Sequence, residues 1–206
     1  MTGRVFIAGT GTGVGKTTFT AAWLRAMPGT LGCKPIESGG SEDSTALAAA
    51  CGRHVPPLHA LRAPISPHLA ARLEGQRISL SALVAWLAVL PSPLLVESAG
   101  GLFSPLTDAG ETNAELAAQL GVPVVLVAPN RLGVLHDVAS ALRASAAMSL
   151  PIAAVVLTGA QALRDDVSTP TNKDELRRLH PVPIYSAAAP ALASTLTALH
   201  RICFPA

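Results

Sequence analysis

Aromatic and charged side chains are scarce in this chain of 206 residues. Aromatic residues make up 3% of the sequence and charged residues 14%, whereas half of the residues are hydrophobic. Ala, Val, Leu and Ile must therefore form the core, a composition that suits helices packed on a buried parallel sheet. The formal net charge is only +2 and the basic residues are scattered, so we expect no nucleic-acid-binding face.

Cysteine is also rare, and its three positions lie far apart: Cys33, Cys51 and Cys203. They form no CxxC pair, and the six histidines show no metal-binding spacing. Such sparse cysteine usage fits a reduced compartment, and we expect a cytoplasmic protein. The first residues have the pattern of a strand rather than that of a charged leader, so no secretion signal is expected.

Long hydrophobic runs are missing as well. Pro91 and Pro93 interrupt one apolar segment, and Ser149 and Pro151 interrupt another. No run reaches the roughly 18 residues that a membrane-spanning helix needs. We therefore expect no association with a membrane, and the length gives no reason to divide residues 1–206 into more than one domain.

The chain does contain a regular alternation of β-branched runs with helical periods. We expect strands at residues 4–9, 31–36, 93–99, 122–129, 152–159 and 182–187, and helices at residues 16–27, 41–51, 67–74, 78–90, 113–121, 135–148, 172–180 and 190–202. This alternation predicts an α/β, P-loop NTPase-like fold with a mostly parallel central sheet and helices on both faces. Ligands bind such sheets at the carboxyl ends of the strands.

The stretch GTGTGVGKTT, residues 9–18, joins the first expected strand to the first expected helix. Glycines let successive N–H groups turn toward a phosphate, and the helix N-terminus adds partial positive charge. The usual pattern is GxxxxGK[ST], and here the first glycine stands one residue earlier. We expect Lys16 to reach the outer phosphates and the Thr17 hydroxyl to ligate Mg²⁺, the alternative being an ordinary glycine-rich turn with a surface lysine. The expected nucleotide-binding residues are Gly13, Val14, Gly15, Lys16, Thr17 and Thr18.

Five segments in the same order resemble motifs of the dethiobiotin synthetases, the enzymes that close the ureido ring in biotin synthesis. The segments are GTGTGVGKT (9–17), CKPIESG (33–39), ISPHLAARLEG (65–75), VESAGGLFSPL (96–106) and RLGVLHD (131–137). The resemblance spans roughly residues 3 to 140 and is weak in the final third. Two departures are Gly11, where the family usually has Asp, and Ser98, where it usually has glycine.

The resemblance implies ATP-dependent carboxylation and ring closure of 7,8-diaminononanoate. CO₂ adds to the diamine as a carbamate, ATP phosphorylates the carbamate to a carbamic-phosphoric anhydride, and the neighbouring amine closes the ring to dethiobiotin. ADP and phosphate leave. The resemblance also implies catalytic roles for Lys16, Lys34 and Thr12, and substrate binding by the Ser38 hydroxyl. Without that resemblance, Lys34 would be an exposed lysine at a strand end.

Mg²⁺ is expected to be held by Thr17 and two carboxylates. Glu97 stands in an apolar strand, where a carboxylate is costly unless it is paired or bound to metal. The resemblance implies that Glu97 is a metal ligand, and a partly solvated acid is the alternative. The family also carries an Asp near the start of the second expected helix, which we assign to Asp43. Glu42 is the neighbouring alternative, and either acid could be an ordinary helix cap.

The segment RLGVLHD lies between an expected strand and an expected helix, where free N–H groups form an anion site. The resemblance implies a homodimer with the active site at the subunit interface. In it, Gly133, Val134 and Leu135 receive the carboxylate of the diaminononanoate bound to the other subunit. We expect Val134 and Leu135 at a loop tip, where apolar side chains suit an interface. A hydrophobic staple within one subunit is the alternative.

Two other functions are kept as alternatives. A partitioning-type regulatory ATPase would carry an additional lysine early in the loop, where this chain has Thr10, Gly11 and Thr12. A related ATP-dependent ligase would act on a different substrate. ATP is expected from the resemblance alone, since Thr158 and Gly159 stand where the family tends to have Asn.

Three further features are expected to be structural. His68 and His136 fall inside family-like segments, and each is expected to cap a helix or to pack. The segment TNKDE (171–175) is not a guanine-binding NKxD motif, because its last position is Glu175. We expect it to be a capped helix start.

Overall fold

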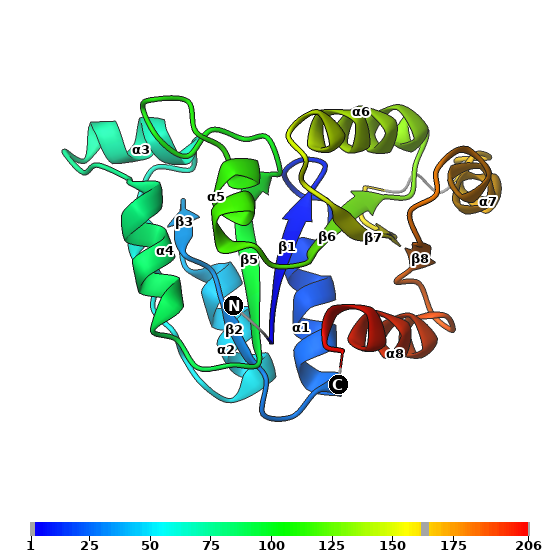
Figure 1. Ribbon diagram of the computed structural model, residues 1–206, viewed down its shortest axis with the longest axis horizontal. Coiled ribbons are helices and arrows are strands. Elements are labelled where there is room, and N and C mark those ends of the chain that lie inside the picture. Colours follow the sequence, from blue (N-terminus) through cyan, green and yellow to red (C-terminus); the bar gives the residue numbers. More distant parts are fainter. Residues whose placement is uncertain (1–2, 162–164, 206) are drawn as a thin grey trace.

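The computed structural model describes residues 3–161 and 165–205. Six strands form one sheet in the order β2-β5-β1-β6-β7-β8, and every pairing in it is parallel (Figure 1). They are β1 (Arg4–Gly9), β2 (Leu31–Cys33), β5 (Leu94–Gly101), β6 (Val124–Pro129), β7 (Ile152–Thr158) and β8 (Ile184–Ser186). The prediction of a P-loop NTPase-like fold with a mostly parallel sheet is confirmed.

Helices cover both faces of this sheet. They are α1 (Lys16–Ala26), α2 (Glu42–Cys51), α3 (Pro67–Leu73), α4 (Leu80–Ala88), α5 (Asn113–Leu120), α6 (Val134–Ala147), α7 (Thr169–Leu179) and α8 (Leu192–Cys203). Side chains of a strand alternate between its two faces. Along β1, Phe6 and Ala8 therefore pack with residues of α3 to α7, whereas Val5 and Ile7 pack with residues of α1, α2 and α8.

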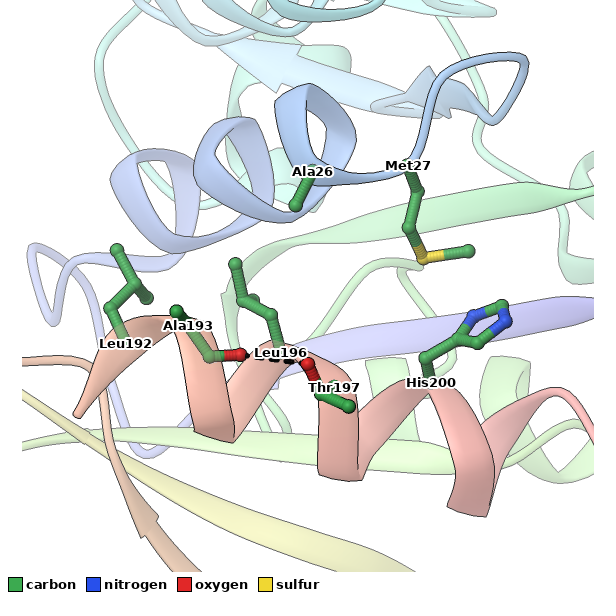
Figure 2. A pocket seen from close by; sticks show the side chains of 7 residues that line it. All are labelled: Ala26, Met27, Leu192, Ala193, Leu196, Thr197 and His200. Atoms are coloured by element: carbon green, nitrogen blue, oxygen red, sulfur yellow. Dashed lines mark hydrogen bonds between the residues drawn. The ribbon is translucent and has the colours of Figure 1, made fainter.

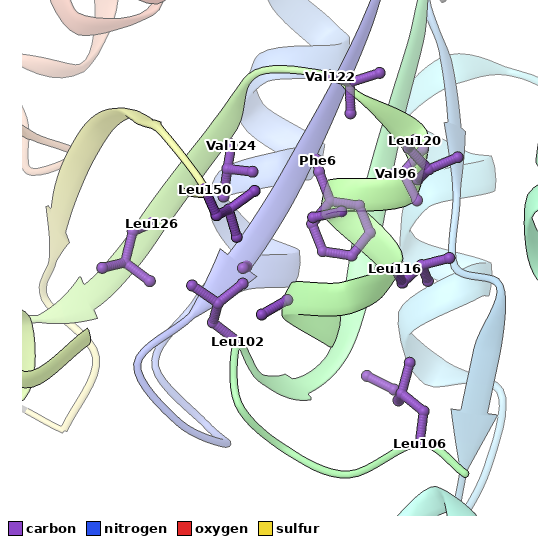
Figure 3. Packing of buried hydrophobic residues seen from close by; sticks show 14 of the residues in the cluster. Phe6, Val96, Leu102, Leu106, Leu116, Leu120, Val122, Val124, Leu126 and Leu150 are labelled. Atoms are coloured by element: carbon purple, nitrogen blue, oxygen red, sulfur yellow. The ribbon is translucent and has the colours of Figure 1, made fainter. Parts of the chain in front are cut away.

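The buried apolar residues form one hydrophobic cluster on each face of the sheet, and the larger cluster is the one that packs with α3 to α7. Phe6 belongs to the larger cluster and is fully buried. Phe6 is in register with Val96 on β5 and with Val124 on β6. Figure 3 shows Leu116 and Leu120 of α5 over the same region. Apolar neighbours on both sides hold β1 in the middle of the sheet, and this position places the loop after Gly9 at the centre of its carboxyl edge.

The expected strand at 31–36 is wrong in one respect, because the chain leaves the sheet at Lys34. Residues Leu31–Cys33 form β2, whereas β3 (Ile36–Ser38) pairs with β4 (His59–Leu61) in a separate two-stranded parallel sheet. Pro35 lies between them, and its carbonyl accepts a hydrogen bond from the His59 N–H at 3.1 Å. Proline has no N–H for a strand ladder. The short β4 carries no alternation long enough to have predicted it.

The helix α7 begins three residues before the expected start, at Thr169 rather than at residue 172. Pro170 occupies its first turn, where the missing N–H costs no hydrogen bond. TNKDE thus lies inside the helix and is not its capped start. Within residues 3–161 and 165–205, no helix combines the length and the apolar character needed to cross a membrane.

Candidate active site

The glycine-rich loop 10–15 joins the end of β1 to the start of α1. Gly15 is the N-cap of α1 with φ 87°, and a Cβ there would lie 3.0 Å from the Thr158 hydroxyl oxygen. Lys16 is 6% exposed, and its Nζ donates to the Gly11 carbonyl at 3.2 Å. Burial lowers the pKa of Lys16 to about 8, against the attraction of Glu97. The loop thus presents backbone N–H groups and a buried cation together.

Thr17 connects the start of α1 to two carboxylates from other elements. Its Oγ1 lies 2.7 Å from Asp43 Oδ1 and 2.8 Å from Glu97 Oε1. Since a hydroxyl has one proton, it can donate to only one of these acceptors at a time. The oxygen atoms Thr17 Oγ1, Asp43 Oδ1 and Glu97 Oε1 thus lie together beside the loop. The single hydroxyl proton of Thr17 cannot serve both carboxylates.

Lys34 lies between the same two carboxylates. Its Nζ is 3.1 Å from Glu97 Oε1 and forms an ion pair with Asp43 Oδ2. Burial alone would lower the pKa of Lys34, but attraction to Glu97 and Asp43 outweighs burial and raises this pKa. For Asp43, burial would raise the pKa, but Lys34 and then Thr17 outweigh it and lower the pKa. Both shifts favour the charged forms of Lys34 and Asp43.

Glu97 is fully buried, and its Oε2 has no hydrogen-bond partner among the described residues. An unpaired buried carboxylate oxygen is costly. Mg²⁺ is a hard cation that takes oxygen ligands, commonly one or two carboxylates with substrate phosphates and water. The oxygens of Thr17, Asp43 and Glu97 fit that ion. In the described part of the chain no larger group of acidic, His and Cys side chains is suited to a metal.

Of the two acids at the start of α2, only Asp43 reaches this cluster. Glu42 is exposed, and its carboxylate lies beside Gly40. Glu37 also contacts this region: it is a buried residue of β3, and its Oε1 accepts from the Asp43 N–H at 2.8 Å. Nothing in its sequence neighbourhood indicated this contact, because it joins a strand to the next helix across a turn of glycines.

A cavity of about 460 Å³ opens beside the cluster at the carboxyl edge of the sheet. Its walls include Thr12, Lys34, Ser38, Asp43, Ser66 and Gly100. The Ser38 hydroxyl oxygen is buried and has no hydrogen-bond partner in the described structure. The structure thus brings five predicted residues, Lys16, Thr17, Lys34, Asp43 and Glu97, next to a cavity that Thr12 and Ser38 line.

A second cavity, of about 290 Å³, lies on the other side of the loop between α1, the end of β7 and α8. Gly15 and Thr18 line it together with Phe19, Thr158 and Leu192. The Thr158 hydroxyl donates to the Val14 carbonyl at 2.7 Å and therefore supports the loop. This cavity therefore adjoins the loop and the first turn of α1.

A third cavity, of about 500 Å³, lies between α1 and α8 (Figure 2). Ala26 and Met27 of the α1 end face Leu196 and His200 of α8 across it. The charged residues of the loop cluster do not line it. It therefore takes no part in the site described above.

The structure corrects the expectation that Val134 and Leu135 form an apolar loop tip. Val134 is fully buried in the larger cluster and Leu135 packs against that cluster, because both belong to the first turn of α6. The exposed apolar side chain is that of Leu132, at 77%. Gly133 is the N-cap of α6 with φ 95°, no side chain caps this helix start, and the Val134 N–H donates to the Arg131 carbonyl at 3.1 Å.

Three other polar residues, His68, His136 and Asn172, lie outside the cluster around Thr17. His68 Nδ1 lies 3.1 Å from the Ser66 hydroxyl oxygen, beside the start of α3, while His136 is exposed on α6. Asn172 is buried, and its side chain donates to Asn130 Oδ1 at 2.9 Å. This contact ties α7 to the loop after β6.

Comparison with known proteins identifies the family. A protein-family model described as an AAA domain matches residues 3–195. The ATP-dependent dethiobiotin synthetase BioD of Anaeromyxobacter dehalogenans (strain 2CP-C) is 42% identical over 193 residues, which cover 85% of this chain and 84% of that protein. The enzyme of the same name from Rhodopseudomonas palustris (strain TIE-1) is 38% identical over 170 residues, 79% of this chain and 78% of that protein.

A ParA family ATPase from Chlorobium tepidum TLS shares the fold, with a TM-score of 0.56 and 14% identity over 95% of this chain and 90% of that one. This likeness is one of fold alone, whereas the curated relatives match at much higher identity over most of their length. The chain belongs to the family of ATP-dependent dethiobiotin synthetases.

Proposed function

We propose that this chain catalyses the ATP-dependent carboxylation and ring closure of 7,8-diaminononanoate, with CO₂ as the carbon source and dethiobiotin, ADP and phosphate as products. The observation that carries the proposal is the meeting of Lys34, Asp43 and Glu97 with the hydroxyl of Thr17, directly after the phosphate-loop lysine. A P-loop alone supports nucleotide hydrolysis. A second buried cation beside a separate cavity supports a reaction with another anionic substrate.

The reaction balances in three steps. One amine of the diamine attacks CO₂ and forms a carbamate with loss of a proton. The carbamate oxygen then takes the γ-phosphoryl group of ATP, and ADP leaves. The second amine attacks the carbonyl carbon of this anhydride, loses a proton as the ring closes, and expels phosphate.

In this scheme Lys16 and the loop N–H groups hold the phosphates, and Lys34 holds the carbamate oxygen next to them. Thr12 and Ser38 line the cavity in which the diamine would lie. Thr17, Asp43 and Glu97 would hold Mg²⁺, which neutralises charge on the transferring phosphoryl group. No side chain needs to act as a covalent nucleophile, so positioning and charge neutralisation supply the catalysis.

The second subunit is part of the proposal. The α6 start at Gly133 has no capping side chain, and the partial positive charge of a helix N-terminus supports binding of a carboxylate there. We infer a homodimer in which this helix start receives the carboxylate tail of the diamine from the neighbouring site. Contact through the backbone at Gly133 replaces the apolar contact first expected from Val134, which lies inside its own subunit. A cytoplasmic location is part of the same proposal.

The experiment that tests the function compares ATP hydrolysis and dethiobiotin formation with and without diaminononanoate and bicarbonate. We expect ADP and dethiobiotin to appear in equal amounts only when both are present. Hydrolysis that ignores the diamine would support a regulatory ATPase. Coupled hydrolysis with a different diamine or amino acid would support a related ligase.

A further inference from the structure

Glu37 is a buried acid that the proposed reaction does not use. Glu37 is 3% exposed, and its Oε1 accepts hydrogen bonds from the N–H groups of Asp43 and Ser44 at 2.8 and 3.2 Å. Its Oε2 lies 3.4 Å from the same Ser44 N–H. The carboxylate therefore sits on the first turn of α2, although it belongs to the strand β3.

The Glu37 carboxylate caps the N-terminus of α2 in place of a local capping side chain. Ser41 is the N-cap of α2, but its side chain makes no capping hydrogen bond. Among the described residues, no ion pair joins Glu37 to a cation. The free N–H groups and the partial positive charge of the α2 start are thus its compensation for burial.

The capped residue is itself a member of the site. The Asp43 N–H donates to Glu37, and the two carboxylate oxygens of Asp43 contact Thr17 and Lys34. Glu37 thereby fixes the backbone from which the Asp43 side chain projects. Two glycines, Gly39 and Gly40, both with positive φ, belong to the connection before α2, and neither has a side chain that could cap the helix start.

We propose that Glu37 is a positioning residue: it holds the start of α2 so that the Asp43 carboxylate stays on the side of Thr17 and completes the cation-binding oxygens. The inference rests on the proposed function for the identity of the cation. Partners of ligating groups that lie one step further out typically change metal affinity by about 10- to 100-fold when they are lost.

The test uses the full chain with Mn²⁺ as the probe and a non-hydrolysable ATP analogue bound. Mn²⁺ binding is followed by electron paramagnetic resonance, and amide exchange over residues 42–47 is measured without metal. We expect Glu37→Ala to speed exchange at Asp43 and Ser44 and to weaken Mn²⁺ binding by about tenfold. Glu37→Gln keeps one oxygen that can accept from both N–H groups, so it should restore most of the affinity.

Glu115→Gln is the matched control, because Glu115 caps α5 by accepting from the Thr112 N–H at 2.8 Å. It should leave Mn²⁺ binding unchanged. Should Glu37→Ala fail to fold, Glu37→Asp replaces it, since the charge is kept but the carboxylate is withdrawn by one methylene. Faster exchange with unchanged Mn²⁺ binding would overturn the positioning role and leave a structural cap.

Asp43→Asn separates this inference from the metal assignment. If Asp43→Asn also leaves Mn²⁺ binding unchanged, Asp43 is not a ligand, and the positioning role falls with it. If Asp43→Asn weakens binding but neither Glu37→Ala nor Glu37→Asp does, only the role of Glu37 is rejected. Wild-type protein that binds Mn²⁺ but forms no dethiobiotin rejects the proposed function, and the same measurements still decide the role of Glu37.

Discussion

The hydroxyl oxygen of Thr17 lies 2.8 Å from Glu97 Oε1, although 80 residues separate the two in the chain. Thr17 belongs to the first turn of α1 and Glu97 to the buried strand β5. Since β1 and β5 are parallel neighbours, with Ile7 in register with Glu97, the helix that follows β1 begins beside the Glu97 carboxylate. Substitutions in this cluster should therefore change metal and phosphate chemistry more than stability.

Lys16→Ala should abolish dethiobiotin formation while the fold is retained. The Lys16 ammonium donates only to the Gly11 carbonyl in the described structure, so its removal breaks no large set of packing contacts. Loss of a charge that stabilises a transferring phosphoryl group costs about 100-fold or more in turnover. Product assays and circular dichroism check the two parts. Lys173, the remaining lysine outside the cluster, gives the control Lys173→Ala. A folded Lys16→Ala protein with normal turnover would reject the phosphate-loop assignment.

Lys34→Ala should lower kcat by about 100-fold and leave the Kd for ATP within about twofold. Its ammonium contacts Asp43 and Glu97 beside the cavity of about 460 Å³, and it does not contact the loop backbone among the described hydrogen bonds. Isothermal titration with ATP and steady-state kinetics separate binding from chemistry. A loss of ATP affinity with an unchanged kcat would show that Lys34 serves the nucleotide and not the carbamate.

Glu97→Gln and Asp43→Asn should each raise the Mg²⁺ concentration that gives half-maximal activity, by about tenfold. Each change removes one negative oxygen from the group around Thr17. Glu42→Gln is the matched control, because Glu42 is exposed and makes no contact with Thr17 or Lys34 among the described hydrogen bonds. A shift in Glu42→Gln with none in Asp43→Asn would exchange the roles of the two acids.

ATP binding should weaken as the pH rises through about 8, because burial lowers the pKa of Lys16 to about 8 in the free protein. Below that pH the ammonium is charged and attracts the phosphates, and above it the neutral amine does not. The kcat/KM for ATP reports pKa values of the free enzyme, and it should fall over this range. A fluorescent ATP analogue titrated at several pH values provides the binding curve. Lys16→Ala should bind weakly without that dependence, and wild-type affinity that is constant up to about pH 9 would contradict the prediction.

Gly133→Leu should raise the KM for diaminononanoate and leave ATP binding nearly unchanged. Its φ of 95° disfavours any side chain, so a leucine strains the start of α6, and a Cβ would lie 3.0 Å from Arg131 Nη1, which must move aside. Gly121→Leu is the control for the backbone cost, since φ there is 61° and a Cβ would meet open space. Sedimentation should find a dimer at assay concentration. A fully active monomer would reject the shared site.

Sequence alone was sufficient for the parts of this protein that depend on local pattern. Apolar β-branched runs alternating with helical periods predicted the order of strands and helices, and the segment 9–18 predicted a glycine-rich loop with Lys16 at the start of α1. Glu97 was conspicuous because a charge in an apolar strand is costly, whereas Lys34 was singled out by the resemblance to the dethiobiotin synthetases. Element ends were less certain: the chain leaves the sheet after Cys33, and α7 begins earlier than its periodicity suggested.

Contacts between distant segments were decided only by the tertiary structure. Asp43 and Glu42 are adjacent acids with the same local propensity, and only the packing of α2 against α1 and β2 directs one of them to Thr17 and Lys34. Val134 looked like a loop tip by sequence, yet the first turn of α6 carries it into the core. Hydrophobic periodicity specifies which face of an element is buried, but which polar atoms then meet depends on how separate elements pack, and that information is spread over the whole chain.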